Sequence, residues 1–138
     1  MILVEGGTKK QRRLAEEVAS FAWKELFPRI NNCYIELHLK KMDGYQGTCE
    51  QIDDREYELQ IDSKQSYEDF VTCIFHEMVH VMQYAKGYMK DKNSEGTKVY
   101  WKGYDYSNYP YSKQPWERQA FRMQEILLKE WKKDVRNN

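Results

Sequence analysis

The sequence predicts an α+β fold in which a helix comes first, three short strands follow, and two further helices are separated by a long irregular segment. Apolar residues recur every three or four positions over residues 8–27, 67–86 and 115–134, which indicates amphipathic helices. Between the first two helices, residues 33–40 and 55–61 alternate apolar and polar side chains, which indicates half-buried strands.

The composition indicates one domain without a strong electrostatic attraction to a partner. A chain of 138 residues can bury a modest core without disulfides. Its 22 basic and 22 acidic residues give zero net charge, which argues against binding to nucleic acid or an anionic membrane. No apolar stretch predicts a membrane span or a signal peptide. The three cysteines lack C-x-x-C spacing, as is typical of reduced thiols, so we expect a cytoplasmic protein.

The first helix is expected to follow Thr8, a residue type favoured at the N-cap, and to end at Pro28. Residues 1–7 are expected to be a flexible or weakly docked terminus. The inward face of the helix is defined by apolar residues at helical spacing: Leu14, Val18, Phe21, Ala22 and Leu26.

The three strands are expected to form an antiparallel meander made of residues 32–40, 48–52 and 55–61. His38 falls on the polar side of the first strand, so we interpret it as a surface histidine. The second helix, residues 67–86, is apolar almost all round, which is typical of a helix at the centre of a fold. Ser66 or Ser63 is its expected N-cap, and Gly87 is its expected stop.

This central helix carries the motif His76-Glu77-Met78-Val79-His80. Positions i and i+4 share one face of a helix, so both imidazoles can bind one ion, while Glu77 projects beside them. Zinc chemistry uses this combination of neutral imidazoles, an open coordination position and a nearby base. Histidines within an apolar helix also need partners, which favours metal binding. Cys73, one turn earlier, is interpreted as a core thiol rather than a ligand.

Residues 88–114 form a long connection without clear periodicity, and such connections are often functional. We expect this segment either to line a substrate cleft or to pack as a surface loop. It contains six of the eleven tyrosines: Tyr88, Tyr100, Tyr104, Tyr106, Tyr109 and Tyr111. The last helix begins at Pro115, and its inward face carries the acidic Glu117. The rest of that face is Ala120, Phe121, Gln124, Leu127, Leu128 and Trp131.

A third protein ligand has to come from elsewhere in the chain. The extended metzincin motif is absent, because Gln83 replaces its glycine and Lys86 its third histidine. A downstream carboxylate would complete a His2Glu site, and Glu117 is favoured because a helix holds it on an apolar face. The candidates are Asp91, Glu95, Asp105, Glu117 and Glu125.

The segment from His76 to Gln83, followed by Tyr111-x-x-x-Pro115-Trp116-Glu117-x-x-Ala120, resembles the small gluzincin-type metallopeptidases that bacteriophages and bacteria often encode. The resemblance covers most of residues 8–134 and implies a minimal zincin fold. In that fold a backing helix and a small sheet precede the H-E-x-x-H helix, and a final helix supplies the glutamate ligand. The resemblance also implies a Zn²⁺ cofactor, a protein or peptide substrate, and the host cytoplasm as location if a phage encodes the chain.

These considerations predict Zn²⁺ bound by His76, His80 and Glu117. Glu77 is then the general base that activates water for attack on a peptide carbonyl. Tyr111 is the first candidate for stabilising the oxyanion and Tyr109 the second. Resemblance to zincins further suggests that the strand from Tyr57 to Ile61 is the sheet edge that pairs with extended substrate.

Other classes of function stay open. The zincin scaffold could serve a binding protein without turnover, such as a phage factor that grips a host protein, although a structural zinc site has no use for the base Glu77. The motif is also similar to SprT-like proteases, which act on proteins near DNA, but their third histidine and zinc ribbon are absent. A nucleic-acid-binding module is opposed by the zero net charge.

Overall fold

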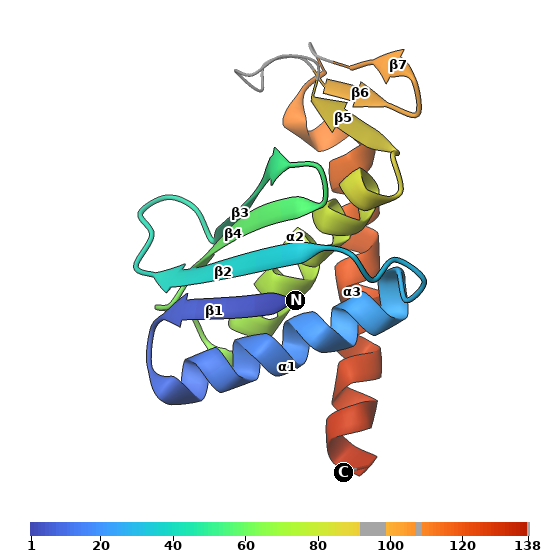
Figure 1. Ribbon diagram of the computed structural model, residues 1–138. Helices are drawn as coiled ribbons and strands as arrows, with labels where there is room; N and C mark the ends of the chain where they lie inside the picture. The colour runs from blue at the N-terminus through green and yellow to red at the C-terminus, as the bar shows by residue number, and fades with distance from the viewer. Residues whose placement is uncertain (92–98, 107–108, 138) are drawn as a thin grey trace.

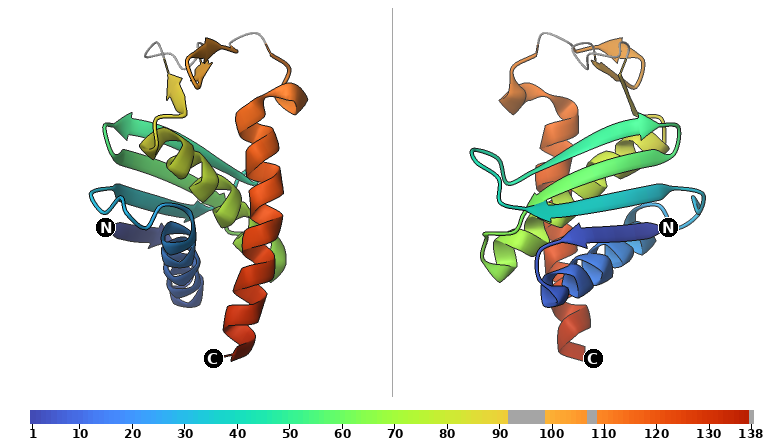
Figure 2. Two further views of the ribbon diagram at one scale, coloured as in Figure 1. Left: turned by 90° about the vertical axis from the view of Figure 1, so that its right-hand side faces the viewer. Right: turned by 60° about the vertical axis from the view of Figure 1, so that its left-hand side comes forward.

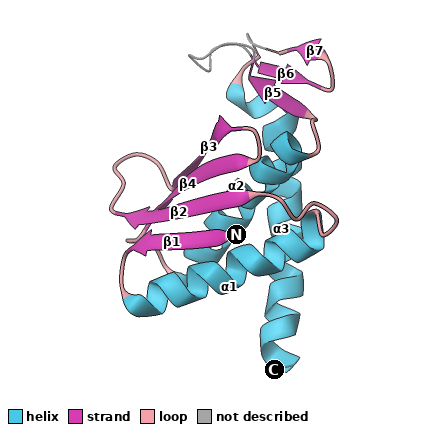
Figure 3. Ribbon diagram, in the orientation of Figure 1, coloured by secondary structure: helices cyan, strands magenta, loops and turns pink. Residues whose placement is uncertain are grey.

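The structure is a computed structural model that describes residues 1–91, 99–106 and 109–137. Over these residues it contains a four-stranded sheet, three α-helices and a separate three-stranded sheet (Figures 1 and 3). The helices α1 (Lys9–Leu26) and α2 (Tyr67–Ala85) cover one face of the larger sheet. The helix α3 (Pro115–Asn137) packs on the side of α2 that faces away from the sheet (Figure 2). The predicted α+β class is confirmed.

The larger sheet is mixed, with the strand order β1-β2-β4-β3. Three of its strands are parallel: β1 (Ile2–Gly6), β2 (Tyr34–Lys40) and β4 (Glu56–Asp62). Only β3 (Gly47–Asp53) is antiparallel to its neighbour, β4. The predicted three-stranded antiparallel meander is therefore wrong, and so is the weakly docked terminus, since residues 2–6 form an edge strand.

Burial explains this strand order. The alternate residues of β2 and β4 that face the helices are almost completely buried, whereas most of β3 is polar and only half-buried. The two most apolar strands therefore occupy the centre of the sheet, and the polar strand takes an edge. It follows that the strand from Tyr57 to Ile61 is not the edge expected from the sequence, because β4 is paired on both sides. The free edge beside α2 belongs to β3.

Helix α1 begins as predicted. The Thr8 hydroxyl accepts a hydrogen bond from the Gln11 backbone amide (3.1 Å), and the Gln11 side chain accepts one from the Thr8 amide (2.9 Å). This reciprocal capping satisfies two amides that a helix start leaves unpaired. The buried face carries mainly small residues, which lets α1 lie close to α2 and the sheet: Ala15, Val18, Ala19, Ala22 and Leu26. Of the predicted inward residues, Leu14 and Phe21 are only partly buried.

Helix α2 is buried on nearly all sides because it lies between the sheet, α1 and α3. Its N-cap is Ser66 rather than Ser63, with the hydroxyl accepting a hydrogen bond from the Asp69 amide (3.2 Å). Gly87 follows the helix in the left-handed conformation, with φ +77°. The expected central position of this helix is confirmed.

Helix α3 starts at Pro115, as expected, and buries Ala120, Leu127, Leu128 and Trp131 mainly against α2. Phe121, predicted to face inward, is half exposed. In the described part of residues 88–114, a second antiparallel sheet replaces the expected irregular loop, followed by a short 3-10 helix, η1 (Tyr111–Lys113). The strands are β5 (Met89–Asp91), β6 (Val99–Trp101) and β7 (Tyr104–Asp105). No described helix combines the length and the apolar character needed to cross a bilayer.

Two glycines offer a test of the β1–β2 pairing. Gly6 has φ +83°, and a Cβ there would overlap the carbonyl oxygen of Leu39 in β2. Gly44 has φ +85°, but nothing lies within 4 Å of the corresponding position. We expect Gly44→Ala to lower the free energy of unfolding by about 1–2 kcal/mol, which is the cost of the left-handed conformation alone.

Gly6→Ala should lower the free energy of unfolding by more than about 3 kcal/mol, because it also forces the two strands apart. Chemical denaturation, monitored by circular dichroism, measures the free energy of unfolding of both variants. Equal losses for Gly6→Ala and Gly44→Ala would contradict the docking of β1 on β2.

Candidate metal centre

Two histidines of α2 and one glutamate of α3 meet between these helices. The Nε2 atoms of His76 and His80 lie 2.9 Å and 3.1 Å from the same oxygen of Glu117, Oε1. One donor atom from each residue lies within 4.8 Å of the other two, so the cluster could hold a metal ion. The i, i+4 spacing places both rings on one face of α2, and the packing of α3 on that face brings the carboxylate to them.

The environment of the cluster favours positive charge at its centre. Burial would raise the pKa of Glu117, but hydrogen bonds and charge from the two histidines outweigh burial and lower this pKa to about 2. For His80, burial would lower the pKa, but the Glu117 carboxylate outweighs that effect and raises it. The carboxylate is therefore ionised at neutral pH, and it stabilises a cation beside the imidazoles.

A glutamine binds the other nitrogen of each imidazole. The Nδ1 atom of His76 lies 2.8 Å from Oε1 of Gln124, and that of His80 lies 2.8 Å from Oε1 of Gln83. Gln83 cannot be flipped, because its amide nitrogen donates to the Trp116 carbonyl and to Gln119 Oε1, both at 2.9 Å. The amide nitrogen of Gln124 likewise faces a carboxylate, that of Glu125, at 3.3 Å.

These glutamines determine what the imidazoles can bind. An amide oxygen only accepts hydrogen bonds, so each Nδ1 must carry a hydrogen. In the neutral rings, each Nε2 then presents its lone pair to Glu117 Oε1. Three electron-pair donors converge on one place, and only a proton or a metal ion there avoids their repulsion. The donor set of two imidazoles and one carboxylate fits zinc.

Glu77 lies beside this cluster, against the edge strand β3. Its side chain is almost fully buried, and burial raises the pKa of its carboxyl group. A Cβ added to Gly47 of β3 would lie 3.2 Å from Glu77 Oε2 and 2.6 Å from the Cys73 sulfur. Glycine at this position therefore leaves room for the Glu77 carboxylate. Cys73 Sγ contacts the Gln46 carbonyl oxygen (3.1 Å) in the core and is not part of the three-residue cluster, as the sequence indicated.

Both predicted tyrosines are about half exposed. The Tyr111 ring packs edge-on against Phe121, which contacts the His76 ring in turn, with 6.4 Å and 4.7 Å between the ring centres. Partial burial and the charge of Glu117 raise the pKa of Tyr111 to about 12, and its role stays a prediction. Tyr109 is half exposed, and its ring packs edge-on against Tyr106, with 4.6 Å between the ring centres. Its role stays a prediction.

The other candidate ligands lie elsewhere. Asp91 accepts a hydrogen bond from the Tyr84 hydroxyl, Asp105 is in β7, and Glu125 is exposed on α3. Glu95 lies outside the described residues. His38 is partly exposed on β2 beside the carboxylates of Glu5, Glu36 and Glu58, in agreement with its interpretation as a surface residue.

The two glutamines were not identified as site residues from the sequence, although a signal existed. Gln83 is a fully buried amide in an apolar helix, three residues after His80. Gln124 lies on the same apolar face as Glu117, two turns later. A buried amide needs a partner, so these positions pointed toward the histidines.

Comparisons of the chain with known protein families, with curated proteins and with solved structures gave no match. The function therefore has to be argued from the site itself.

The carboxylate can be tested with two variants of the same helix. Glu117→Ala should lower the affinity for zinc by more than about 100-fold, because it removes a direct ligand. Glu130→Ala, which changes an exposed glutamate further along α3, should leave zinc affinity almost unchanged. Titration with zinc against a chelating dye measures both. Strong zinc binding by Glu117→Ala would contradict the role of Glu117 as the third ligand.

Gln83 offers a second test. Gln83→Met keeps the length of the side chain but removes the acceptor for His80 Nδ1, so zinc affinity should fall by about 10–100-fold. Gln60→Met is the matched control and should bind zinc like the wild type, because this side chain of β4 lies on the sheet face opposite the buried Tyr57, Leu59 and Ile61. Unchanged affinity in Gln83→Met would contradict the role of this glutamine.

Proposed function

We propose that the protein is a zinc-dependent metallopeptidase that hydrolyses peptide bonds. The observation that supports it most strongly is the convergence of two imidazole lone pairs and a Glu117 oxygen beside a buried carboxyl group, Glu77. A purely structural site would need a fourth protein ligand rather than an acid–base group. Three donors and a free carboxylate fit a hydrolytic site.

In the proposed mechanism, His76, His80 and Glu117 hold the zinc ion. The bound ion would supply Lewis acidity and an acidic water, with one coordination position left open by the three protein ligands. The glutamines fix both rings with Nε2 toward the ion. The ligands come from helices rather than loops, which keeps their geometry constant during the reaction.

Glu77 acts as the general base and then as the general acid. It takes a proton from the attacking water and delivers it to the leaving amine, so that no net proton is consumed in the cycle. Its raised pKa supports this role, because a carboxylate with higher proton affinity is a better base at neutral pH. Gly47 contributes by leaving space for the carboxylate beside β3.

Tyr111 donates a hydrogen bond to the oxyanion that forms from the peptide carbonyl. Its raised pKa keeps the hydroxyl protonated well above neutral pH. Its ring contacts Phe121, which contacts His76, so the proposed role needs only a short reach toward the cluster. The substrate lies extended along β3 rather than along the strand from Tyr57 to Ile61 suggested by the resemblance to zincins, because the free edge beside Glu77 belongs to β3.

The mechanism is tested by Glu77→Gln. This variant should bind zinc like the wild type and should hydrolyse fluorescein-labelled casein about 10²–10⁴-fold more slowly, because the amide cannot accept the proton. The matched control is Glu56→Gln, an exposed residue at the far end of β4, which should retain full activity. Full activity in Glu77→Gln would contradict the mechanism. If zinc-loaded wild type cleaves neither casein nor a random peptide library, a protein that binds without turnover is the better account.

A further inference from the structure

We propose that the pocket beside the zinc site binds a positively charged lysine or arginine side chain of the substrate. This inference rests on the proposed peptidase function and adds a substrate class to it. The pocket has a volume of about 270 Å³ and opens directly from two residues of the candidate metal site, His80 and Glu117. The other described residues that line it are Cys49, Glu50, Tyr84, Met89, Asp91, Val99 and Trp116.

One wall of the pocket is apolar. Met89 and Trp116 are almost fully buried and belong to a small hydrophobic cluster that Val99 and Tyr84 adjoin. Such a wall suits the methylene groups of a long side chain, which gain by leaving water while the charged end stays solvated or paired. The volume is below that of pockets for drug-sized ligands, and it is suited to a single side chain.

Among the described residues that line the pocket, the carboxylates are Glu117, Glu50 of β3 and Asp91 of β5, and none is a lysine or arginine. No ion pair joins Glu50 or Asp91 to a lysine or arginine of the described part of the chain. The Tyr84 hydroxyl lies 3.3 Å and 3.2 Å from the two oxygens of Asp91, which holds that carboxylate in position at the wall.

The charge balance favours a cationic group. When a divalent ion is bound, the charges of Glu77 and Glu117 cancel its own. The charges of Glu50 and Asp91 are then left without a counter-charge among the described residues that line the pocket. Partial burial also raises the pKa of Asp91, against the hydrogen bond from Tyr84, so this carboxylate is already short of solvation. A lysine or arginine head group supplies the missing charge and hydrogen bonds.

The position of the pocket along β3 indicates that it binds a substrate residue close to the scissile bond. Gly47 is beside Glu77, and Glu50 is three residues further along the same strand. Three residues of a strand span roughly 10 Å. A substrate paired with β3 would therefore carry one side chain into the pocket within about three residues of the scissile bond.

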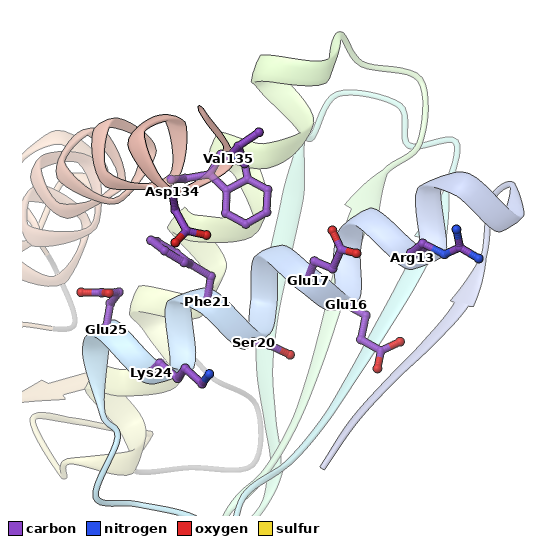
Figure 4. Close-up of a pocket in the computed structure, with 10 residues that line it drawn as sticks. Arg13, Glu16, Glu17, Ser20, Phe21, Lys24, Glu25, Asp134 and Val135 are labelled. Carbon is purple, nitrogen blue, oxygen red and sulfur yellow. The ribbon is translucent and has the colours of Figure 1, made fainter. Parts of the chain in front are cut away.

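A larger hollow of about 810 Å³ lies between α1 and α3, and its charged residues differ from those of the pocket beside Glu117 (Figure 4). None of the three candidate metal ligands lines it. Its walls carry charges of both signs, from Arg13, Glu16, Glu17, Lys24, Glu25 and Asp134. The charge of the pocket beside Glu117 is therefore not a general feature of the hollows of this protein.

The test uses a set of peptides that differ only at one central residue, which is arginine, lysine, norleucine or glutamate. All are acetylated and amidated, so that a free terminal amine cannot supply the positive charge. Binding is measured by fluorescence anisotropy on zinc-loaded Glu77→Gln, and cleavage is measured with zinc-loaded wild type. The arginine and lysine peptides should bind about tenfold more tightly than norleucine and be cleaved correspondingly faster.

The same measurements are made after adding Asp91→Asn or Glu50→Gln, each of which removes one charge at constant shape. The preference for arginine over norleucine should fall severalfold in both. Asp43→Asn, an exposed aspartate in the β2–β3 connection, is the matched control and should keep the preference. Circular dichroism and zinc content verify that every variant is folded and loaded.

The outcomes separate this inference from the proposed function. Cleavage without preference for arginine or lysine overturns the pocket assignment and leaves the peptidase intact. So does a preference that survives both charge-removing variants. A preference in binding without cleavage of any peptide supports the pocket and contradicts the peptidase. A preference seen only when the acetyl group is omitted assigns the charge to a terminal amine and overturns the side-chain proposal.

Discussion

The structure depends on one polar contact between two helices, the meeting of His76 and His80 with Glu117. A carboxylate and two imidazoles between packed helices are costly to bury unless each is matched, and here they match one another. The apolar contacts of α3 with α2, through Ala120, Leu127 and Leu128, provide the favourable free energy that holds the two helices together. The packing therefore fixes where Glu117 lies, and the cluster in turn specifies the register of α3 on α2.

Gln83 connects this cluster to the backbone. It orients His80 through its amide oxygen and binds the Trp116 carbonyl through its amide nitrogen, one residue before Glu117. One buried amide thus links a ligand of α2 to the helical turn that carries the ligand of α3. Because Gln83 is completely buried and both ends of its amide are hydrogen-bonded, the link is strong in the low dielectric of the interior. The candidate metal site therefore lies within the packing contact between α2 and α3 and depends on it.

Much of this arrangement could be predicted from the sequence. The three helices, the cap at Thr8 and the common face of His76 and His80 were predicted, because each depends on residues a few positions apart. Glu117 was favoured among five acidic candidates by a local argument, its place on an apolar helical face. The sheet was predicted wrongly. Alternation identifies a strand but not its neighbour, so residues 2–6 were missed and β4 was taken for an edge.

The sequence by itself determined the three helices, the strands β2, β3 and β4 and the chemistry that these elements can present, because backbone periodicity and capping act within one or two turns of chain. Only the tertiary structure decided which elements are neighbours. It placed β4 between β2 and β3, gave the free edge to β3, and brought Gln83 and Gln124 to the two histidines. The physical reason is that strand order and helix packing depend on the total apolar area buried across the fold, which no local spacing records.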